Sequence, residues 1–196
     1  MTNFETLRKT LEANDFDVTV FATKEEACDY LDAKLDGKTI GHGGSMTLTE
    51  MGLLDRLASH ATLYRHQPGS SPTEAATAQV YLCSVNGIAE TGEIINIDGA
   101  ANRVSSTMFG HEELYLVVGR NKIAPTYDEA LWRARNIAAP RNAKRLGRKT
   151  PCAVNGDKCY NCNSPERICR ALTVLWKRPW GIQKAEVVLV DEDLGY

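Results

Sequence analysis

Apolar positions along this chain switch between helical and strand-like spacing. Phe4, Leu7 and Leu11 recur as they would on one face of a helix, and residues 17–22 then form a run of β-branched and aromatic side chains that is typical of a strand. A second apolar stripe ends near Gly37, and a short apolar run over residues 38–41 follows it. The first part of the chain therefore predicts the order helix, strand, helix, strand.

The same alternation continues to the C-terminus. We expect strands at residues 61–64, 87–89, 93–97, 114–118 and 185–190, and helices at residues 47–57, 73–82, 126–139 and 167–177. Thr47 and Glu50 have the spacing of a capping box, and Pro140 should end a helix because it lacks a backbone N–H. Residues 68–72 are typical of a surface loop. This order predicts an α/β fold, with a Rossmann-like, mostly parallel sheet and helices on both faces.

Composition and charge narrow the functional classes. The 196 residues are 43% apolar and 24% charged, which is ordinary for a globular protein with a full core. The net charge of −2 argues against a nucleic-acid binder, which needs a broad basic surface. The N-terminus lacks a basic and apolar leader, and no apolar stretch approaches the roughly 18 residues of a membrane span. We therefore expect a cytoplasmic protein that binds neither membrane nor nucleic acid.

The six cysteines are unevenly distributed. Cys28 and Cys83 stand alone in apolar surroundings, so we expect them in the core. The other four lie in the cysteine segment, residues 152–169, and are Cys152, Cys159, Cys162 and Cys169. In a reducing compartment clustered thiols bind metal more often than they form disulfides. The prolines, asparagines and glycine around and between them favour tight turns, so the four sulfurs are candidate ligands of one metal centre.

Two kinds of metal centre suit four cysteines. Zinc sites usually pair two short Cys knuckles, whereas this spacing contains one, so a [4Fe-4S] cluster is expected before zinc. Either centre would be anionic, and the basic segment that precedes it, residues 133–149, carries seven cationic side chains and no acidic one. The alternatives are a solvated helix face for the basic segment, and ordinary thiols or disulfides for the cysteines. Cys169 is expected in the first turns of the helix at residues 167–177.

A glycine-rich loop follows the predicted strand at residues 38–41. Gly43, Gly44 and Ser45 lie between that strand and the next helix, where backbone N–H groups can hold a phosphate or carboxylate. The loop matches neither the P-loop nor the dinucleotide-binding fingerprint, and a purely structural turn is the alternative. These three residues are candidate ligand-binding residues.

Polar residues also flank the predicted strand at residues 93–97. Glu90 and Thr91 precede it, while Asp98, Asn102 and Arg103 follow it. Ligands of open α/β sheets bind outside the carboxyl ends of strands, so these residues and the glycine loop could face one crevice. Glu90 and Asp98 are then candidate catalytic acid–base groups, and Arg103 would pair with an anionic substrate. The alternative is that Asp98 begins a turn and Asn102 caps a helix.

Three stretches of sequence resemble one protein family. Residues 43–47 (GGSMT), 86–92 (NGIAETG) and 159–169 (CYNCNSPERIC) are similar to the lactate-utilization (LUD) domain family, and in particular to its small, cysteine-containing, single-domain branch. The resemblance extends over nearly the whole chain. It implies one LUD-like domain over residues 1–196, with a fold similar to ribose-5-phosphate isomerase and coenzyme A transferases.

The resemblance and the cysteines together give three functional hypotheses. The first is a lactate-utilization-type redox or electron-transfer protein with a [4Fe-4S] cluster beside a pocket for a hydroxy acid or phosphate. The second is a non-redox enzyme acting on a phosphorylated sugar, hydroxy acid or acyl-CoA, with a structural metal. The third is a non-catalytic assembly partner of an iron–sulfur dehydrogenase. The candidate partners are a small anionic metabolite, iron–sulfur or dehydrogenase subunits, and further copies of the chain.

Overall fold

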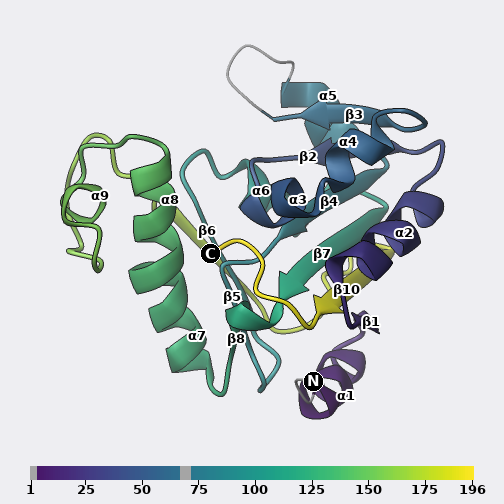
Figure 1. Ribbon diagram of the computed structural model, residues 1–196, viewed down its shortest axis with the longest axis horizontal. Helices are drawn as coiled ribbons and strands as arrows, with labels where there is room; N and C mark the ends of the chain where they lie inside the picture. Colours follow the sequence, from purple (N-terminus) through teal and green to yellow (C-terminus); the bar gives the residue numbers. More distant parts are fainter. Residues whose placement is uncertain (1–3, 67–71) are drawn as a thin grey trace.

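The computed structural model describes residues 4–66 and 72–196, and its centre is a six-stranded, all-parallel sheet (Figure 1). In sheet order the strands are β1 (Asp17–Phe21), β10 (Lys184–Val190), β7 (Glu113–Gly119), β4 (Val80–Ser84), β2 (Thr39–His42) and β3 (Thr62–Arg65). The central strands are almost wholly buried, as expected for a parallel sheet that is covered on both faces. The predicted α/β fold with a parallel sheet is confirmed.

Helices cover one face of this sheet. They are α2 (Lys24–Lys34), α3 (Met46–Met51) and α4 (Leu53–Leu57). Tyr115 and Val117 of β7 point to this side and pack with Leu31, Leu48 and Leu57 of the three helices. Because side chains alternate along a strand, the neighbouring residues of β7 point to the opposite face.

A second, smaller sheet shares the opposite face with α1 (Glu5–Ala13). Its strands, in sheet order, are β8 (Ile123–Ala124), β5 (Gly87–Ala89), β6 (Ile94–Asp98) and β9 (Ala171–Leu175). Leu114 and Leu116 of β7 pack in one core with Leu7 of α1 and Ile88 and Ile94 of the small sheet. The expected helices on both faces are therefore present, but one face is covered largely by strands.

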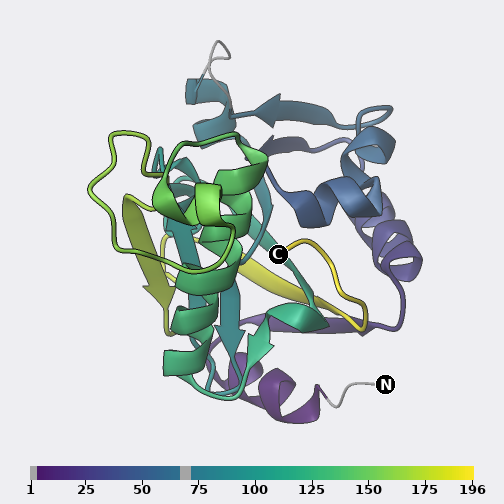
Figure 2. The ribbon, with the colours of Figure 1, turned by 60° about the vertical axis from the view of Figure 1, so that its left-hand side comes forward.

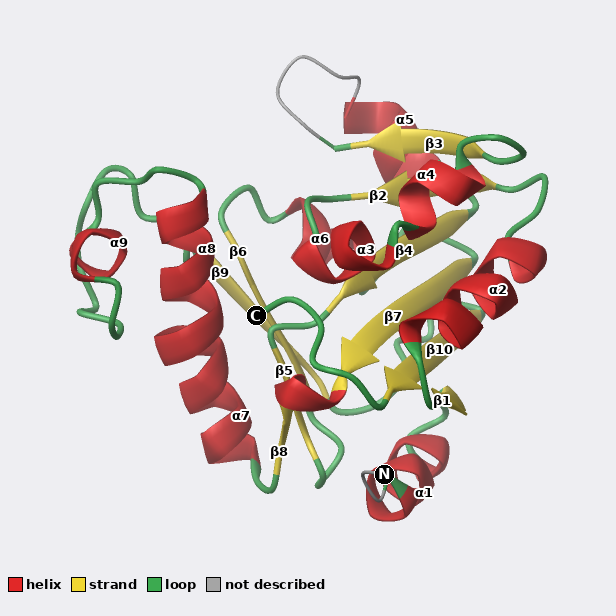
Figure 3. Cartoon of the chain, viewed as in Figure 1, coloured by secondary structure: helices red, strands yellow, loops and turns green. Residues whose placement is uncertain are grey.

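The outermost layer is a long helical segment against the far side of the small sheet, seen clearly in Figure 3. It runs through α7 (Tyr127–Arg133), a π-helical turn, η2 (Ala134–Ala138), and α8 (Ala139–Arg145). Ala130 and Ala134 pack on Ile95 and Ile97 of β6. The remaining elements are α5 (Pro72–Thr77), α6 (Asn102–Ser106), the short 3-10 helix η1 (Arg120–Lys122) and α9 (Pro151–Asn155).

Several expected element boundaries were wrong. Pro140 does not end the helix: it lies in the first turn of α8, directly after the π-helical turn, whose shifted hydrogen bonding accommodates the missing N–H. The helix expected at residues 73–82 stops at Thr77, and Val80 begins the central strand β4. Residues 171–175 form strand β9 instead of the last helix, so Cys169 precedes a strand.

The helix after the glycine loop begins earlier than expected. Ser45 is the N-cap of α3, and its hydroxyl accepts a hydrogen bond from the Leu48 N–H at 3.3 Å. Thr47, the expected cap, lies fully buried inside the helix. Of the loop expected over residues 68–72, residues 68–71 lie outside the described residues. Within the described ranges, no helix combines the length and apolar character needed to cross a membrane.

Candidate functional site

The cysteine segment packs outside the α7–α8 helix as a loop that is mostly irregular in structure (Figure 2). Short turns reverse its direction, including one at Asn161, whose φ is 46°. All four of its cysteines are partly buried and line one small cavity. Pro140 and Ala143 of α8 form the apolar wall of this cavity. The turns thus bring the four predicted thiols around a single space.

Nitrogen donors point at two of these sulfurs. The Arg167 Nε lies 3.2 Å from the Cys169 Sγ, and the Asn161 backbone N–H donates to the Cys159 Sγ at 3.3 Å. Arg135 approaches the same Cys159 sulfur at 3.9 Å. The hydrogen bond to Cys169, together with the nearby thiol groups, raises the pKa of the Arg167 guanidinium. These nitrogen donors would stabilise the thiolate form of the cysteines, which is the form that binds metal.

The four sulfurs are not gathered as a mononuclear site requires. In residues 4–66 and 72–196, no group of three or more His, Cys, Asp or Glu side chains is placed to hold one metal ion. A tetrahedral zinc would need each sulfur about 2.3 Å from a common point. All four cysteines nevertheless line the same small cavity.

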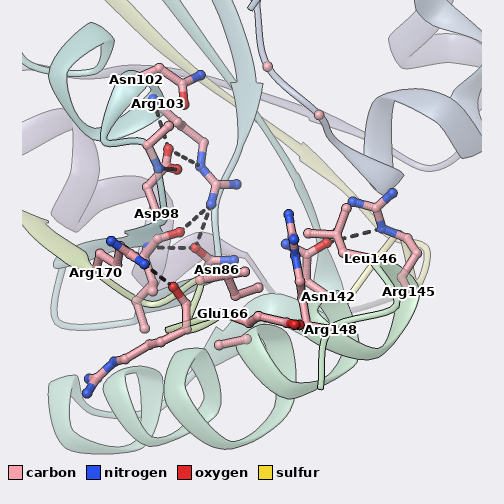
Figure 4. A pocket seen from close by; sticks show the side chains of 18 of the residues that line it. Asn86, Asp98, Asn102, Arg103, Asn142, Arg145, Leu146, Arg148, Glu166 and Arg170 are labelled. Carbon is pink, nitrogen blue, oxygen red and sulfur yellow. Dashed lines mark hydrogen bonds and ion pairs between the residues drawn. The ribbon is translucent and has the colours of Figure 1, made fainter. Parts of the chain in front are cut away.

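A second, larger cavity of about 510 Å³ lies beside the cysteine segment. One wall is formed by the glycine loop, the end of β6 and α6, and the other by the end of α8 and residues 165–170. Figure 4 shows Asp98 and Arg103 on the first side, facing Asn142, Arg145 and Arg148 across the cavity. The cavity therefore lies at the carboxyl ends of β2 and β6.

Asp98 and Arg103 are held in place by neighbouring groups. The Asp98 carboxylate accepts the Arg103 N–H at 2.9 Å and the Ala100 N–H at 3.2 Å. The Arg103 guanidinium donates to the Ile97 carbonyl at 2.5 Å and to the Asn86 side-chain oxygen at 3.1 Å. Asp98 thus closes the turn into α6, as the structural alternative expected, while it also lines the cavity. Both roles are compatible, because each carboxylate oxygen can accept a further hydrogen bond.

The glycine loop reaches the same cavity. Gly43 and Gly44 both line it, together with Asn102 and Arg103. A Cβ added at Gly43 would lie 3.4 Å from the Asn102 Nδ2, whereas one added at Gly44 would meet no atom within 4 Å. Ser45 faces a smaller neighbouring cavity and caps α3. The structure therefore brings together the glycine loop and the residues that follow β6.

Glu90 and Thr91 lie elsewhere. They form the turn between β5 and β6, which are antiparallel, so this turn is at the opposite end of β6 from Asp98. Thr91 donates to the Glu93 carboxylate at 2.5 Å, and neither Glu90 nor Thr91 is among the residues that line the large cavity. The expectation of one crevice containing both ends of the strand was therefore wrong. It placed Glu90 as if β5 were parallel to β6.

The basic segment divides among three surroundings. Arg133 is buried and donates to the Asn86 and Asn121 carbonyls, both at 2.7 Å, so it is a structural residue. Arg135 faces the cysteines, whereas Arg145 and Arg148 face the large cavity. Helical periodicity separates Arg133, Arg135 and Arg145, because residues along the α7–α8 helix point in successive directions, whereas Arg148 lies in the loop after α8. Parts of the segment thus contact each candidate site.

The two cavities share a wall. Ala139, Arg167 and Ile168 line both. Besides its contact with Cys169, Arg167 donates through Nη1 to the Cys162 carbonyl at 2.9 Å. One guanidinium therefore touches the cysteine segment on one side and borders the large cavity on the other.

Lys122 is a candidate residue that the sequence does not reveal. It follows β7, and its ammonium group donates to the Thr47 hydroxyl at 2.8 Å, the Ser84 hydroxyl at 2.9 Å and the Val85 carbonyl at 3.1 Å. It is 4% exposed, and no carboxylate is among these partners. Burial, with the positive charges of nearby arginines, lowers its pKa to about 7. Lys122 can be recognised only from the tertiary structure, because no motif in the sequence around Arg120–Lys122 distinguishes it from an ordinary surface lysine.

Lys122 also lies close to the large cavity. It lines the smaller cavity that contains Ser45, and the two cavities share Gly44, Asn86 and Arg103. A lysine with a pKa near neutrality can accept or donate a proton at physiological pH. The Lys122 amine is therefore a candidate acid–base group next to the large cavity.

Comparison with known proteins identifies the family. The chain belongs to the LUD domain family, whose model matches residues 4–190. Its structure is similar to the crystal structure of a DUF162 family protein from Deinococcus radiodurans, with a TM-score of 0.59 over 95% of each chain and 16% sequence identity. At that identity the similarity shows a shared fold and does not carry a function. The comparison with curated proteins gives no match.

Proposed function

We propose that this member of the LUD domain family is a lactate-utilization-type redox protein that holds a [4Fe-4S] cluster beside an anion-binding pocket. One observation carries the proposal: all four cysteines of residues 152–169 line a single cavity, and that cavity shares a wall with a larger cationic one. Four thiolates are a complete ligand set for a cubane cluster. A partly buried electron carrier next to an anion pocket would suit such a protein.

The residues present fit the cluster better than zinc. The apolar wall from Pro140 and Ala143 and the N–H donors to Cys159 and Cys169 suit a cluster site, and the single short Cys knuckle is unlike the paired knuckles of zinc sites. Cys152, Cys159, Cys162 and Cys169 would hold the cluster, which when bound supplies one-electron transfer. Because all four thiolates would be used as ligands, electron transfer is favoured over substrate activation at iron.

The protein's own residues would position the anionic metabolite. Arg103 is fixed by two hydrogen bonds and faces the cavity, so its orientation is set before a ligand arrives. Gly43 and Gly44 leave room for close approach to the backbone. Arg167 lies between the two sites and would sense charge on either side. We include iron–sulfur or dehydrogenase subunits as proposed electron partners.

The test is anaerobic purification followed by iron, zinc and acid-labile sulfide analysis and visible absorption. We expect a brown protein with iron and sulfide in equal amounts. Cys162→Ser should lose most of the iron, while Cys28→Ser, which keeps a donor to the Met51 carbonyl in the core, should retain it. A colourless protein with one zinc and no sulfide would end the cluster proposal.

A second candidate is a non-redox acid–base enzyme with a structural metal, and Lys122 is the observation that favours it. A buried lysine with a pKa of about 7, next to Asn86 and Arg103, is suited to proton transfer. This candidate predicts that turnover of a phosphorylated sugar or hydroxy acid survives Cys162→Ser but not Lys122→Met. The opposite result favours the redox protein.

A further inference from the structure

The large cavity carries a marked excess of positive charge. Its lining includes six arginines and two carboxylates, an excess of four positive charges; the residues are Arg65, Arg103, Arg145, Arg148, Arg167 and Arg170, with Asp98 and Glu166. Both carboxylates already accept backbone N–H groups, Asp98 from the turn into α6 and Glu166 from Lys149 at 2.7 Å. These backbone contacts hold both carboxylates in place, and the cationic groups still outnumber them in the cavity.

These arginines come from separate parts of the fold. Arg103 comes from α6, Arg145 and Arg148 from the end of α8 and the loop after it, and Arg170 from the loop before β9. Like charges that converge from several directions repel one another and destabilise the folded protein unless a counter-charge is bound. A single carboxylate can pair with one guanidinium, or at most two, at a time. A ligand with several negative charges can pair with both walls at once.

The cavity also has an apolar part. Ile97, Leu146 and Ile168 line it between the charged groups. Its volume of about 510 Å³ lies within the range of sites for complete metabolites and cofactors, roughly 300–1,000 Å³. Lactate would fill only a small part of this space. The lining suits a ligand that has an uncharged body as well as anionic groups.

We propose that the large cavity binds a phosphorylated metabolite with at least two anionic groups and an uncharged body, and that it discriminates against small monocarboxylates such as lactate. The inference rests on the proposed anion-binding role of this cavity and does not depend on the cluster. It assigns Arg145 and Arg148 to one anionic group and Arg103 to another, with the body of the ligand against Ile168.

The test is isothermal titration calorimetry at fixed, moderate ionic strength with ADP, pyrophosphate and L-lactate as probes. We expect ADP and pyrophosphate to bind, and L-lactate to bind at least tenfold more weakly than ADP. Arg148→Gln should weaken ADP binding about tenfold, because it removes one charge-assisted hydrogen-bonding group. Arg148 is exposed, so this variant should fold normally.

Arg141→Gln is the matched control, since Arg141 is an exposed arginine of α8 that does not line the cavity. It should bind ADP with unchanged affinity. Lactate binding as tightly as ADP, or equal ADP affinity in the Arg148→Gln and Arg141→Gln proteins, would overturn the inference. A protein that binds ADP but contains no iron or sulfide refutes the redox proposal and leaves this inference standing, so the two failures are distinguishable.

Discussion

Lys122 provides a sharp test of the electrostatics inside this fold. Its pKa falls from an ordinary 10.5 to about 7, because burial disfavours the charged ammonium and nearby arginines add repulsion. Between these two values the unfolded chain binds more protons than the folded protein does. Stability from this group therefore rises with pH across that range, and the penalty is greatest below about pH 7. Lys122→Met should abolish this part of the pH dependence.

The magnitude follows from the two pKa values. A lysine with pKa values of 10.5 unfolded and about 7 folded costs about 5 kcal/mol when it is fully charged in both states. From pH 7 to pH 8.5 the penalty decreases by about 1–2 kcal/mol. The difference in unfolding free energy between Lys122→Met and the wild type should therefore shift by this amount over that interval. Loss of the three hydrogen bonds changes the offset between the two proteins, not its pH dependence.

Urea unfolding of both proteins at pH 7 and pH 8.5, under anaerobic and reducing conditions, measures this shift. Groups elsewhere in the protein contribute equally to both and cancel in the comparison. NMR of ¹³Cε-labelled lysines gives a second readout, in which one resonance should titrate near pH 7 and be missing from Lys122→Met. If every lysine titrates above pH 9.5, or if both proteins show the same pH dependence, the reasoning is refuted.

Three further predictions concern stability. Gly41→Ala should lower the free energy of unfolding, measured with urea, by about 1–3 kcal/mol, because the added Cβ would overlap the Ala75 carbonyl of α5. Gly44→Ala, which faces open space, serves as the tolerated control. Thr126→Ala should cost about 1 kcal/mol by removing the capping box of α7, and an unchanged midpoint would contradict that role. Burial would raise the pKa of Glu186, but hydrogen bonds from side chains of α2 and β1 outweigh burial and lower it. The ionised Glu186 carboxylate therefore stabilises the folded protein above about pH 4.5, and this contribution is lost as the pH falls further. Glu186→Gln should accordingly lose less stability in acid than the wild type does. Equal acid profiles of the two proteins would count against this.

The two neighbouring cavities could be coupled electrostatically through Arg167. Arg167 donates to the cysteine segment and also borders the cationic cavity, so a ligand bound there would change the electrostatic field at the sulfurs. The same field that attracts an anionic metabolite would stabilise an anionic centre. Binding and electron transfer would then be linked through one guanidinium.

Local sequence determined a large part of this structure. Buried strands such as residues 114–118 and 185–190 were recognisable as continuous apolar runs bounded by polar residues. The four clustered cysteines could be identified because residues close in sequence, separated by turn-forming residues, have few ways to stay apart. The glycine loop and Asp98 were both expected at the carboxyl ends of strands, and both lie there, although β2 belongs to the parallel sheet and β6 to the small sheet.

Only the tertiary structure decided the rest. Leu172 and Leu175 have a spacing that suits a helix, but residues 171–175 form a strand because pairing with β6 satisfies their backbone groups. Glu90 could not be separated from Asp98 in sequence, since the direction of β5 against β6 depends on long-range pairing. Lys122 gains its altered pKa from burial beneath groups that are 37 or more residues away in the chain. Local spacing sets which elements can form, whereas pairing and burial, which depend on distant residues, set what surrounds each side chain.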